Sequence, residues 1–147
     1  MNVKQFFSVP EQGKAASMAL LLLRIVVGLA FMHHGWGKIQ HPTSWMGEES
    51  TTPAVFQLLA AVSEFGGGLA WILGLLTPLA ALGILATMTV AAWMVAVEGG
   101  YPFVSSTGGP AFELPLVYLS IALLLISAGP GRWSLDRVLF GPRPAEI

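Results

Sequence analysis

The fold is decided by residues 53–76, PAVFQLLAAVSEFGGGLAWILGLL. This run is longer than the roughly 20 helical residues that cross a hydrocarbon core about 30 Å thick. Glu64 is a lone carboxylate near its middle, where an ionised side chain costs on the order of 3 kcal/mol unless it finds a partner or water. The stretch therefore predicts a membrane-spanning helix whose carboxylate meets a partner inside a bundle.

The composition places the whole chain in the membrane class. Hydrophobic residues make up 54% of the 147 and charged residues only 10%, whereas soluble domains carry about a quarter charged residues. Apolar runs of spanning length lie at about 18–36, 53–76, 79–97 and 111–128. Because backbone groups in lipid must be satisfied within helices or barrels, we predict an all-α integral membrane four-helix bundle, with residues 1–147 forming a single membrane domain.

The segment after Gly129-Pro130-Gly131 predicts one further helix, at about 132–140. Aromatic and aliphatic residues alternate there with arginine and aspartate, which is typical of a helix lying in the membrane interface. Ser134 is available as its N-cap. We expect this interfacial C-terminal helix to anchor the bundle on the inner leaflet.

The distribution of lysine and arginine predicts the orientation, because cytoplasmic flanks are enriched in them. The N-terminal arm and the tail carry Lys4, Lys14, Arg132, Arg137 and Arg143, whereas the opposite side has Lys38 alone beside Glu48, Glu49 and Glu98. We therefore expect an inner-membrane protein with both termini in the cytoplasm. No small-residue cleavage pattern follows residues 18–32, which favours a retained helix over a cleaved signal peptide.

Several function classes are disfavoured by composition. The net charge of −1 gives no electrostatic footprint for nucleic acid. The absence of cysteine excludes thiol relays and iron–sulfur ligation, so redox chemistry must belong to a bound cofactor or a partner. His33 and His34 diverge on a helix and no HExxH spacing occurs, so no metal site is expected, with haem or metal binding kept as the weaker alternative.

The first helix has one polar, glycine-lined face, which is what an inward surface looks like. At about 100° per residue, the residues within about 40° of Arg24 are Gly28, Phe31, Gly35 and Lys38, and His34 lies about 80° away. Arg24 has two equally weighted alternatives: it snorkels toward the cytoplasm, or it points inward and pairs with Glu64. For Glu64 the alternative is a protonated carboxyl that is hydrogen-bonded to a neighbouring helix.

A second group of polar residues is expected at the outer end of the bundle. His34 and Lys38 lie one turn apart there, and Glu113 opens the fourth helix at a similar height. Trp36 and Tyr101 should reach this level too, which outlines a polar vestibule under the glycine-rich loop. Taken singly, Lys38 also fits an interfacial anchor, Glu113 a first-turn acid and His34 a headgroup contact.

With these residues the chain resembles the DoxX family of small four-helix membrane proteins over about residues 19–139. The matching positions are Leu22-Leu23-Arg24, Gly28, His34-Gly35-Trp36-Gly37-Lys38, Glu64, Gly67-Gly68-Leu69, Gly74, Glu113, Gly129-Pro130-Gly131 and Ser134-Leu135-Asp136. The resemblance implies a four-helix bundle. The family namesake is a subunit of a thiosulfate:quinone oxidoreductase, and other relatives are linked to quinone or oxidative-stress responses.

The sequence therefore supports two functional hypotheses. In the first, the chain is a quinone-associated oxidoreductase subunit with a membrane or soluble redox partner, in which Glu64 and His34 are catalytic. Its predicted ligand-binding residues are Arg24, Lys38, Glu113, Trp36 and Tyr101. In the second, the chain is a non-enzymatic binding, transport or assembly module in the lipid bilayer. Small-residue faces on the second and third helices serve either packing within the chain or a homo-oligomer.

Overall fold

The structure, a computed structural model, describes residues 3–143, and the regular elements along them are helical. The elements are α1 (Val3–Phe7), α2 (Lys14–Gln40), α3 (Ala54–Ala61), η1 (Val62–Gly66), α4 (Gly67–Leu73), α5 (Thr77–Trp93), η2 (Met94–Glu98), α6 (Glu113–Ala128) and α7 (Leu135–Phe140). The prefix η marks a π-helical turn. The predicted all-α fold is confirmed.

Three helical stretches in the described part of the chain are long and apolar enough to cross a membrane, namely Lys14–Gln40, Ala54–Leu73 and Thr77–Glu98. The second stretch joins α3, η1 and α4, and the third joins α5 and η2. Helix α6 is also apolar but shorter, with 16 residues. These four stretches are the helices expected from the sequence.

The turn between the second and third spans lies earlier than predicted. We expected it at Thr77-Pro78, but those residues already belong to α5. The turn instead uses Gly74 (φ 62°) and Leu76 (φ 48°), both in the left-handed region. Glycine enters that region without steric cost, which is why it commonly ends a helix. Pro78 fits the first turn of α5 because a backbone N–H there has no partner within the helix.

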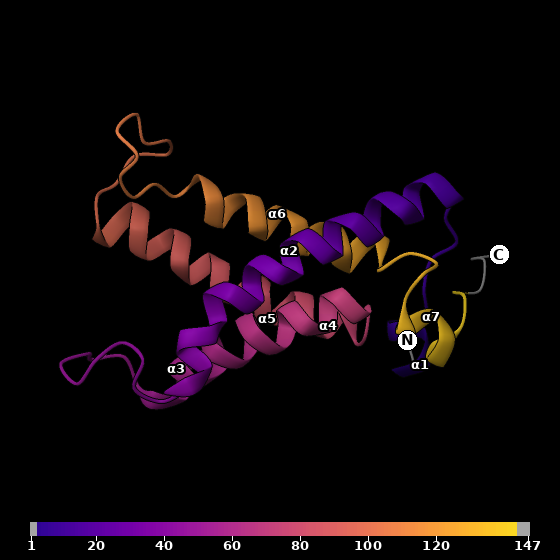
Figure 1. The fold of residues 1–147 in the computed structure, drawn as a ribbon, viewed down its shortest axis with the longest axis horizontal. Coiled ribbons are helices and arrows are strands. Elements are labelled where there is room, and N and C mark those ends of the chain that lie inside the picture. The colour runs from indigo at the N-terminus through magenta and orange to yellow at the C-terminus, as the bar shows by residue number, and fades with distance from the viewer. Residues whose placement is uncertain (1–2, 144–147) are drawn as a thin grey trace.

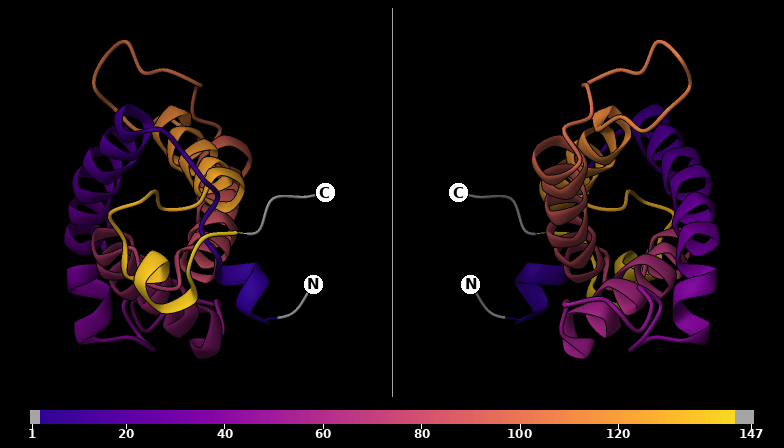
Figure 2. Two further views of the ribbon diagram at one scale, coloured as in Figure 1. Left: turned by 90° about the vertical axis from the view of Figure 1, so that its right-hand side faces the viewer. Right: turned by 90° about the vertical axis from the view of Figure 1, so that its left-hand side faces the viewer.

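The helices run antiparallel in chain order. Figure 1 shows loops 41–53 and 99–112 together at one end, called here the loop end, and α1 and α7 at the opposite end, called the terminal end. Helix α2 packs on η1 and α4, α4 packs on α5, and α5 packs on α6. In the end-on views of Figure 2 these helices surround a common core, and α7 lies across its terminal end.

The predicted inward face of α2 is confirmed. Arg24, Gly28, Phe31 and Gly35 are all buried. The Phe31 ring meets that of Trp71 edge to face, with centroids 5.7 Å apart, a geometry that aromatic pairs prefer. These rings belong to a core to which α2, α4, α5 and α6 all contribute buried side chains.

Close approach of the first two spans depends on glycine. A Cβ atom on Gly28 would lie 2.6 Å from the carbonyl oxygen of Gly68, and one on Gly68 would lie 2.7 Å from that of Gly28. A Cβ on Gly67 would lie 3.1 Å from Ile84 of α5. Since small residues allow membrane helices to touch along their backbones, this small-residue face is used for packing within the chain.

The terminal end is closed by the predicted tail helix and the N-terminal segment. Ser134 caps α7 by accepting a hydrogen bond from the Arg137 backbone N–H at 3.2 Å, as the sequence predicted. Phe140 of α7 stacks on Phe7 of α1 with centroids 5.1 Å apart. Val138 on the outer face is exposed, which suits a helix that lies in the interface.

Candidate functional site

Glu64 lies on a π-helical turn in the middle of the second span. A π-helical turn widens an α-helix locally, and such turns occur frequently at functional sites. Gly35 of α2 lies directly against η1, because a Cβ there would be 2.6 Å from the backbone nitrogen of Phe65. This close approach buries Glu64, whose exposed fraction is 3%.

The partner of Glu64 is Lys38. The Lys38 ammonium donates a hydrogen bond of 2.6 Å to Glu64 Oε1, and the two side chains are 25% and 4% exposed. The hypothesis that Arg24 supplies the counter-charge is therefore wrong. Helical side chains lean toward the N-terminus of their own helix, so Lys38 reaches from the loop end back to the depth of the carboxylate.

The loop between α2 and α3 is folded over Lys38. The ammonium lies 4.4 Å from the centre of the Trp45 ring, a cation–π contact. The Trp45 indole N–H donates to the carbonyl of Gln57 at 2.9 Å. The buried Gln57 side chain donates to the Thr52 carbonyl and accepts from the Met46 N–H, so this loop is an ordered cover.

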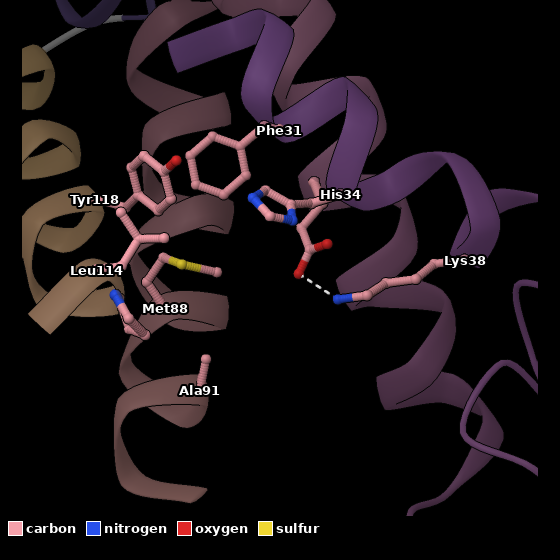
Figure 3. A pocket seen from close by; sticks show the side chains of 9 residues that line it. Phe31, His34, Lys38, Met88, Ala91, Leu114 and Tyr118 are labelled. Carbon is pink, nitrogen blue, oxygen red and sulfur yellow. Dashed lines mark hydrogen bonds and ion pairs between the residues drawn. The ribbon is translucent and has the colours of Figure 1, made fainter. Parts of the chain in front are cut away.

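A cavity of about 220 Å³, called here the inner cavity, lies beside the ion pair. Figure 3 shows the rings of Phe31, His34 and Tyr118 around this space, with a dashed line marking the ion pair at Lys38. Glu64 Oε2 is buried and has no hydrogen-bond partner among the described residues. The full lining is Phe31, His34, Lys38, Glu64, Met88, Ala91, Leu114, Pro115 and Tyr118.

A larger opening of about 670 Å³, called here the groove, lies on the other side of the pair. Its walls come from α3 and η1 on one side and from α5 and η2 on the other. Lys38, Glu64 and Ala91 line both the groove and the inner cavity. The ion pair is therefore the common boundary of two spaces.

The donors around the inner cavity suit a ligand that carries carbonyl oxygens. The Lys38 ammonium brings three N–H donors, and the His34 imidazole brings at least one. Within residues 3–143, no three His, Asp or Glu side chains converge where they could hold a metal ion. The site thus offers hydrogen-bond donors and one carboxylate to an organic head group.

The other predicted ligand-binding residues lie outside the two openings. Trp36 is exposed and packs against the ring of Phe65 with centroids 5.8 Å apart. Tyr101 is exposed in loop 99–112. Glu113 is exposed at the start of α6, next to Leu114, which does line the inner cavity. The structure brings Glu64, Lys38 and His34 together, and the roles of Trp36, Tyr101 and Glu113 stay predictions.

Arg24 is buried at the terminal end, with an exposed fraction of 1%. Its guanidinium donates to the backbone carbonyls of Trp71 (2.8 Å), Ile72 (3.2 Å), Trp133 (3.1 Å) and Pro130. It therefore neither pairs with the carboxylate of the second span nor snorkels to the surface. Instead it joins the end of α4 to the segment that precedes α7.

Asp136 is a buried structural residue whose role the sequence analysis missed. Its carboxylate accepts hydrogen bonds from the backbone N–H groups of Leu76 (2.6 Å) and Thr77 (2.8 Å), where α5 begins. Its own N–H donates to the Gly74 carbonyl at 2.8 Å. The partners precede it in the chain by about sixty residues, so no local pattern could report them. A carboxylate among the aromatic and aliphatic residues of the tail was the available signal.

Comparisons with known proteins agree with this architecture. The DoxX family model matches residues 19–97. An inner membrane protein of Escherichia coli, YqjF, is 31% identical over 131 residues, which cover 86% of this chain and 95% of the relative. An uncharacterized membrane protein of Mycobacterium tuberculosis is 34% identical over 133 residues, covering 82% and 81%. No solved structure matches the chain. The protein is a membrane protein that belongs to the DoxX family.

Proposed function

We propose that this protein binds the head group of a quinone at the Lys38–Glu64 pair and acts as the quinone-associated subunit of an inner-membrane oxidoreductase. The observation that carries the proposal is the buried Glu64 Oε2 without a hydrogen-bond partner beside the inner cavity. A buried polar atom without a partner costs about 1–3 kcal/mol. A quinol, the reduced form of a quinone, can donate a hydroxyl hydrogen bond to this oxygen and would recover that free energy.

The residues of the inner cavity fit a quinone head. Its two carbonyl oxygens need donors, which Lys38 and His34 can supply, and its ring needs apolar walls such as those of Phe31 and Tyr118. A bound quinone accepts two electrons and two protons in becoming a quinol. The carboxylate of Glu64 can hold a proton at Oε2, and His34 at the exposed rim can pass protons from water.

The electrons must come from outside this chain or from a further group. The chain has no cysteine, so it brings no thiol or thiolate-held cluster of its own. A membrane or soluble redox protein is therefore the proposed partner. The namesake of the family, a subunit of a thiosulfate:quinone oxidoreductase, supports this assignment by analogy.

The proposal includes an orientation with both termini in the cytoplasm. Lys14, Arg132 and Arg137 lie at the terminal end, and Lys38 at the loop end is neutralised by its ion pair with Glu64. The positive-inside rule then places the terminal end inward. Because the chain has no cysteine, single cysteines introduced at Glu48 and at Arg132 would each be labelled from one side only by a membrane-impermeant maleimide.

The binding step is tested by titrating the purified protein, in lipid nanodiscs, with the quinol form of a quinone that has a single-isoprene tail, kept reduced under anaerobic conditions, and measuring the heat of binding. We expect saturable binding that weakens about tenfold or more in Glu64→Gln, since the quinol hydroxyl donates to the Glu64 carboxylate and hydrogen bonds to charged groups contribute about 1.5–3 kcal/mol. Glu98→Gln, an exposed carboxylate outside both openings, is the control. Equal binding in both variants would refute the assignment.

A non-enzymatic binding or transport module is the second candidate, and the groove beside the ion pair favours it. Such a module would bind the same class of ligand without electron transfer. Native mass spectrometry of gently solubilised protein separates the two candidates. A bound quinone together with a co-purifying redox protein supports the subunit, whereas a quinone without a partner supports the module.

A further inference from the structure

The groove is built for an apolar molecule of substantial size. Its volume of about 670 Å³ falls within the range of about 300–1,000 Å³ that is typical of small-molecule sites, whereas the inner cavity is smaller than this range. Phe56 and Leu59 on α3 and Val90 on α5 line the groove and are each more than half exposed. These residues lie on membrane-spanning stretches, so their exposed surfaces face lipid.

Most of the polar side chains in the groove are already satisfied by the protein. The Thr87 hydroxyl donates to the carbonyl of Gly83 at 3.0 Å. The amide of Gln57 is bonded to the loop that covers the loop end of the groove. The charged groups of the lining are Lys38 and Glu64, at the boundary with the inner cavity. The groove therefore has one polar end and an apolar length.

We infer that the groove binds the apolar chain of the same ligand whose head lies at Lys38–Glu64, so that the ligand is a single-chain amphiphile that enters sideways from the bilayer between α3 and α5. This inference rests on the proposed function for the head group and adds a second subsite to it. Continuity supports one occupant, because Lys38, Glu64 and Ala91 line both spaces. The ordered cover formed by Trp45 and Gln57 closes the loop end, which leaves the lipid side for entry.

The test uses a photoreactive probe, a benzoquinol with a two-isoprene tail that ends in a diazirine, kept reduced under anaerobic conditions. The full chain in phosphatidylcholine nanodiscs is irradiated with this probe, and the labelled peptides are identified by mass spectrometry. We expect the tail to label residues 54–63 and 83–94. Ala86→Phe, an exposed groove position, should lower this labelling about tenfold. Ala19→Phe, an equally exposed position on α2 outside both openings, should leave it unchanged.

A tail-less benzoquinol separates failure of this inference from failure of the proposed function. If the tail-less compound binds wild type and Ala86→Phe equally and its binding depends on Glu64, the head site is intact and Ala86→Phe is folded. Tail labelling spread evenly over all lipid-facing helices would then overturn the inference that the groove binds the apolar chain, and would leave the head site standing. Groove labelling that is as strong in the Glu64→Gln variant as in wild type would instead overturn the proposal that the ligand head binds at Lys38–Glu64. A headless diazirine alkane should label the groove no more strongly than other lipid-facing surfaces, and equal groove labelling by it would overturn the single-ligand inference.

Discussion

Two regions of the bundle each bury a charged side chain, but they satisfy it in opposite ways. At the terminal end, the Arg24 guanidinium donates to four backbone carbonyls. Near the middle of the second span, Glu64 has one oxygen paired with Lys38 and one oxygen without a hydrogen-bond partner among the described residues, beside a cavity. The first arrangement is complete and leaves no group for a ligand, whereas the second is incomplete and borders two spaces.

This difference separates a structural charge from a functional one. Arg24 donates to the carbonyls of Ile72, at the end of α4, and Trp133, in the segment before α7. The Lys38–Glu64 pair satisfies only itself, and a buried ion pair is weak grounds for stability because desolvation offsets the attraction. The comparison predicts that variants at the terminal end lose stability, while variants at the ion pair lose binding.

Arg24→Gln should have the largest effect on stability. A glutamine amide cannot reach all four carbonyls, and each buried polar group left without a partner costs about 1–3 kcal/mol. Thermal unfolding in nanodiscs should show a strongly lowered midpoint or loss of folded protein. Arg132→Gln, an exposed arginine in the same segment, is the matched control and should unfold like wild type.

Asp136→Ala should have the second-largest effect on stability. The substitution leaves the N–H groups of Leu76 and Thr77 without their acceptor at the start of α5, and each buried donor left without an acceptor costs about 1–3 kcal/mol. Asp136→Asn keeps one acceptor oxygen and should recover part of the loss. Unfolding measured side by side for the two variants checks this order, and an asparagine variant weaker than the alanine variant would contradict it.

Lys38→Met should destabilise less than Arg24→Gln, because the Lys38 side chain is 25% exposed and the carboxylate can neutralise by taking up a proton. We expect a loss of about 1–3 kcal/mol, the cost of an unpaired buried polar group. The double variant Lys38→Met with Glu64→Gln removes both charges and should regain much of that loss. A double variant less stable than Lys38→Met would show that the pair is not coupled as described.

Glu64→Gln should have the smallest effect on stability, below about 1 kcal/mol, because glutamine has the same shape and can still accept from Lys38. Its effect on quinol binding should nevertheless be the largest of the four. A Glu64→Gln protein that unfolds as readily as Arg24→Gln would show that both charges are structural and would remove the contrast between the two regions.

The sequence was sufficient to predict the membrane-spanning helices and part of the candidate site. Apolar run length identified the four helices, and the angular pattern on the first helix correctly placed Gly28, Phe31 and Gly35 on the inward face. The helix cap at Ser134 was also predicted correctly. These features are local or periodic, so they can be read from neighbouring residues.

The pairing of the buried charges could not be predicted from azimuth alone. Arg24 and Lys38 lie on the same face of α2, and both lean toward its N-terminus. Because of this direction, the Arg24 side chain extends toward the terminal end and the Lys38 side chain extends back to Glu64. The Arg24–Glu64 pair that the shared helix face suggested is therefore not formed. The π-helical turn and the contacts of Asp136 depend on residues distant in the chain, which no local pattern contains.

The most direct test of the functional charge is the shift in unfolding midpoint that a quinol causes in wild type and in Glu64→Gln. A ligand that binds only the folded state stabilises it by about 2.7 kcal/mol at one hundred times its dissociation constant. We predict a clear upward shift for wild type and almost none for Glu64→Gln at the same quinol concentration. An equal shift in both proteins would contradict the claim that the buried carboxylate is the ligand site.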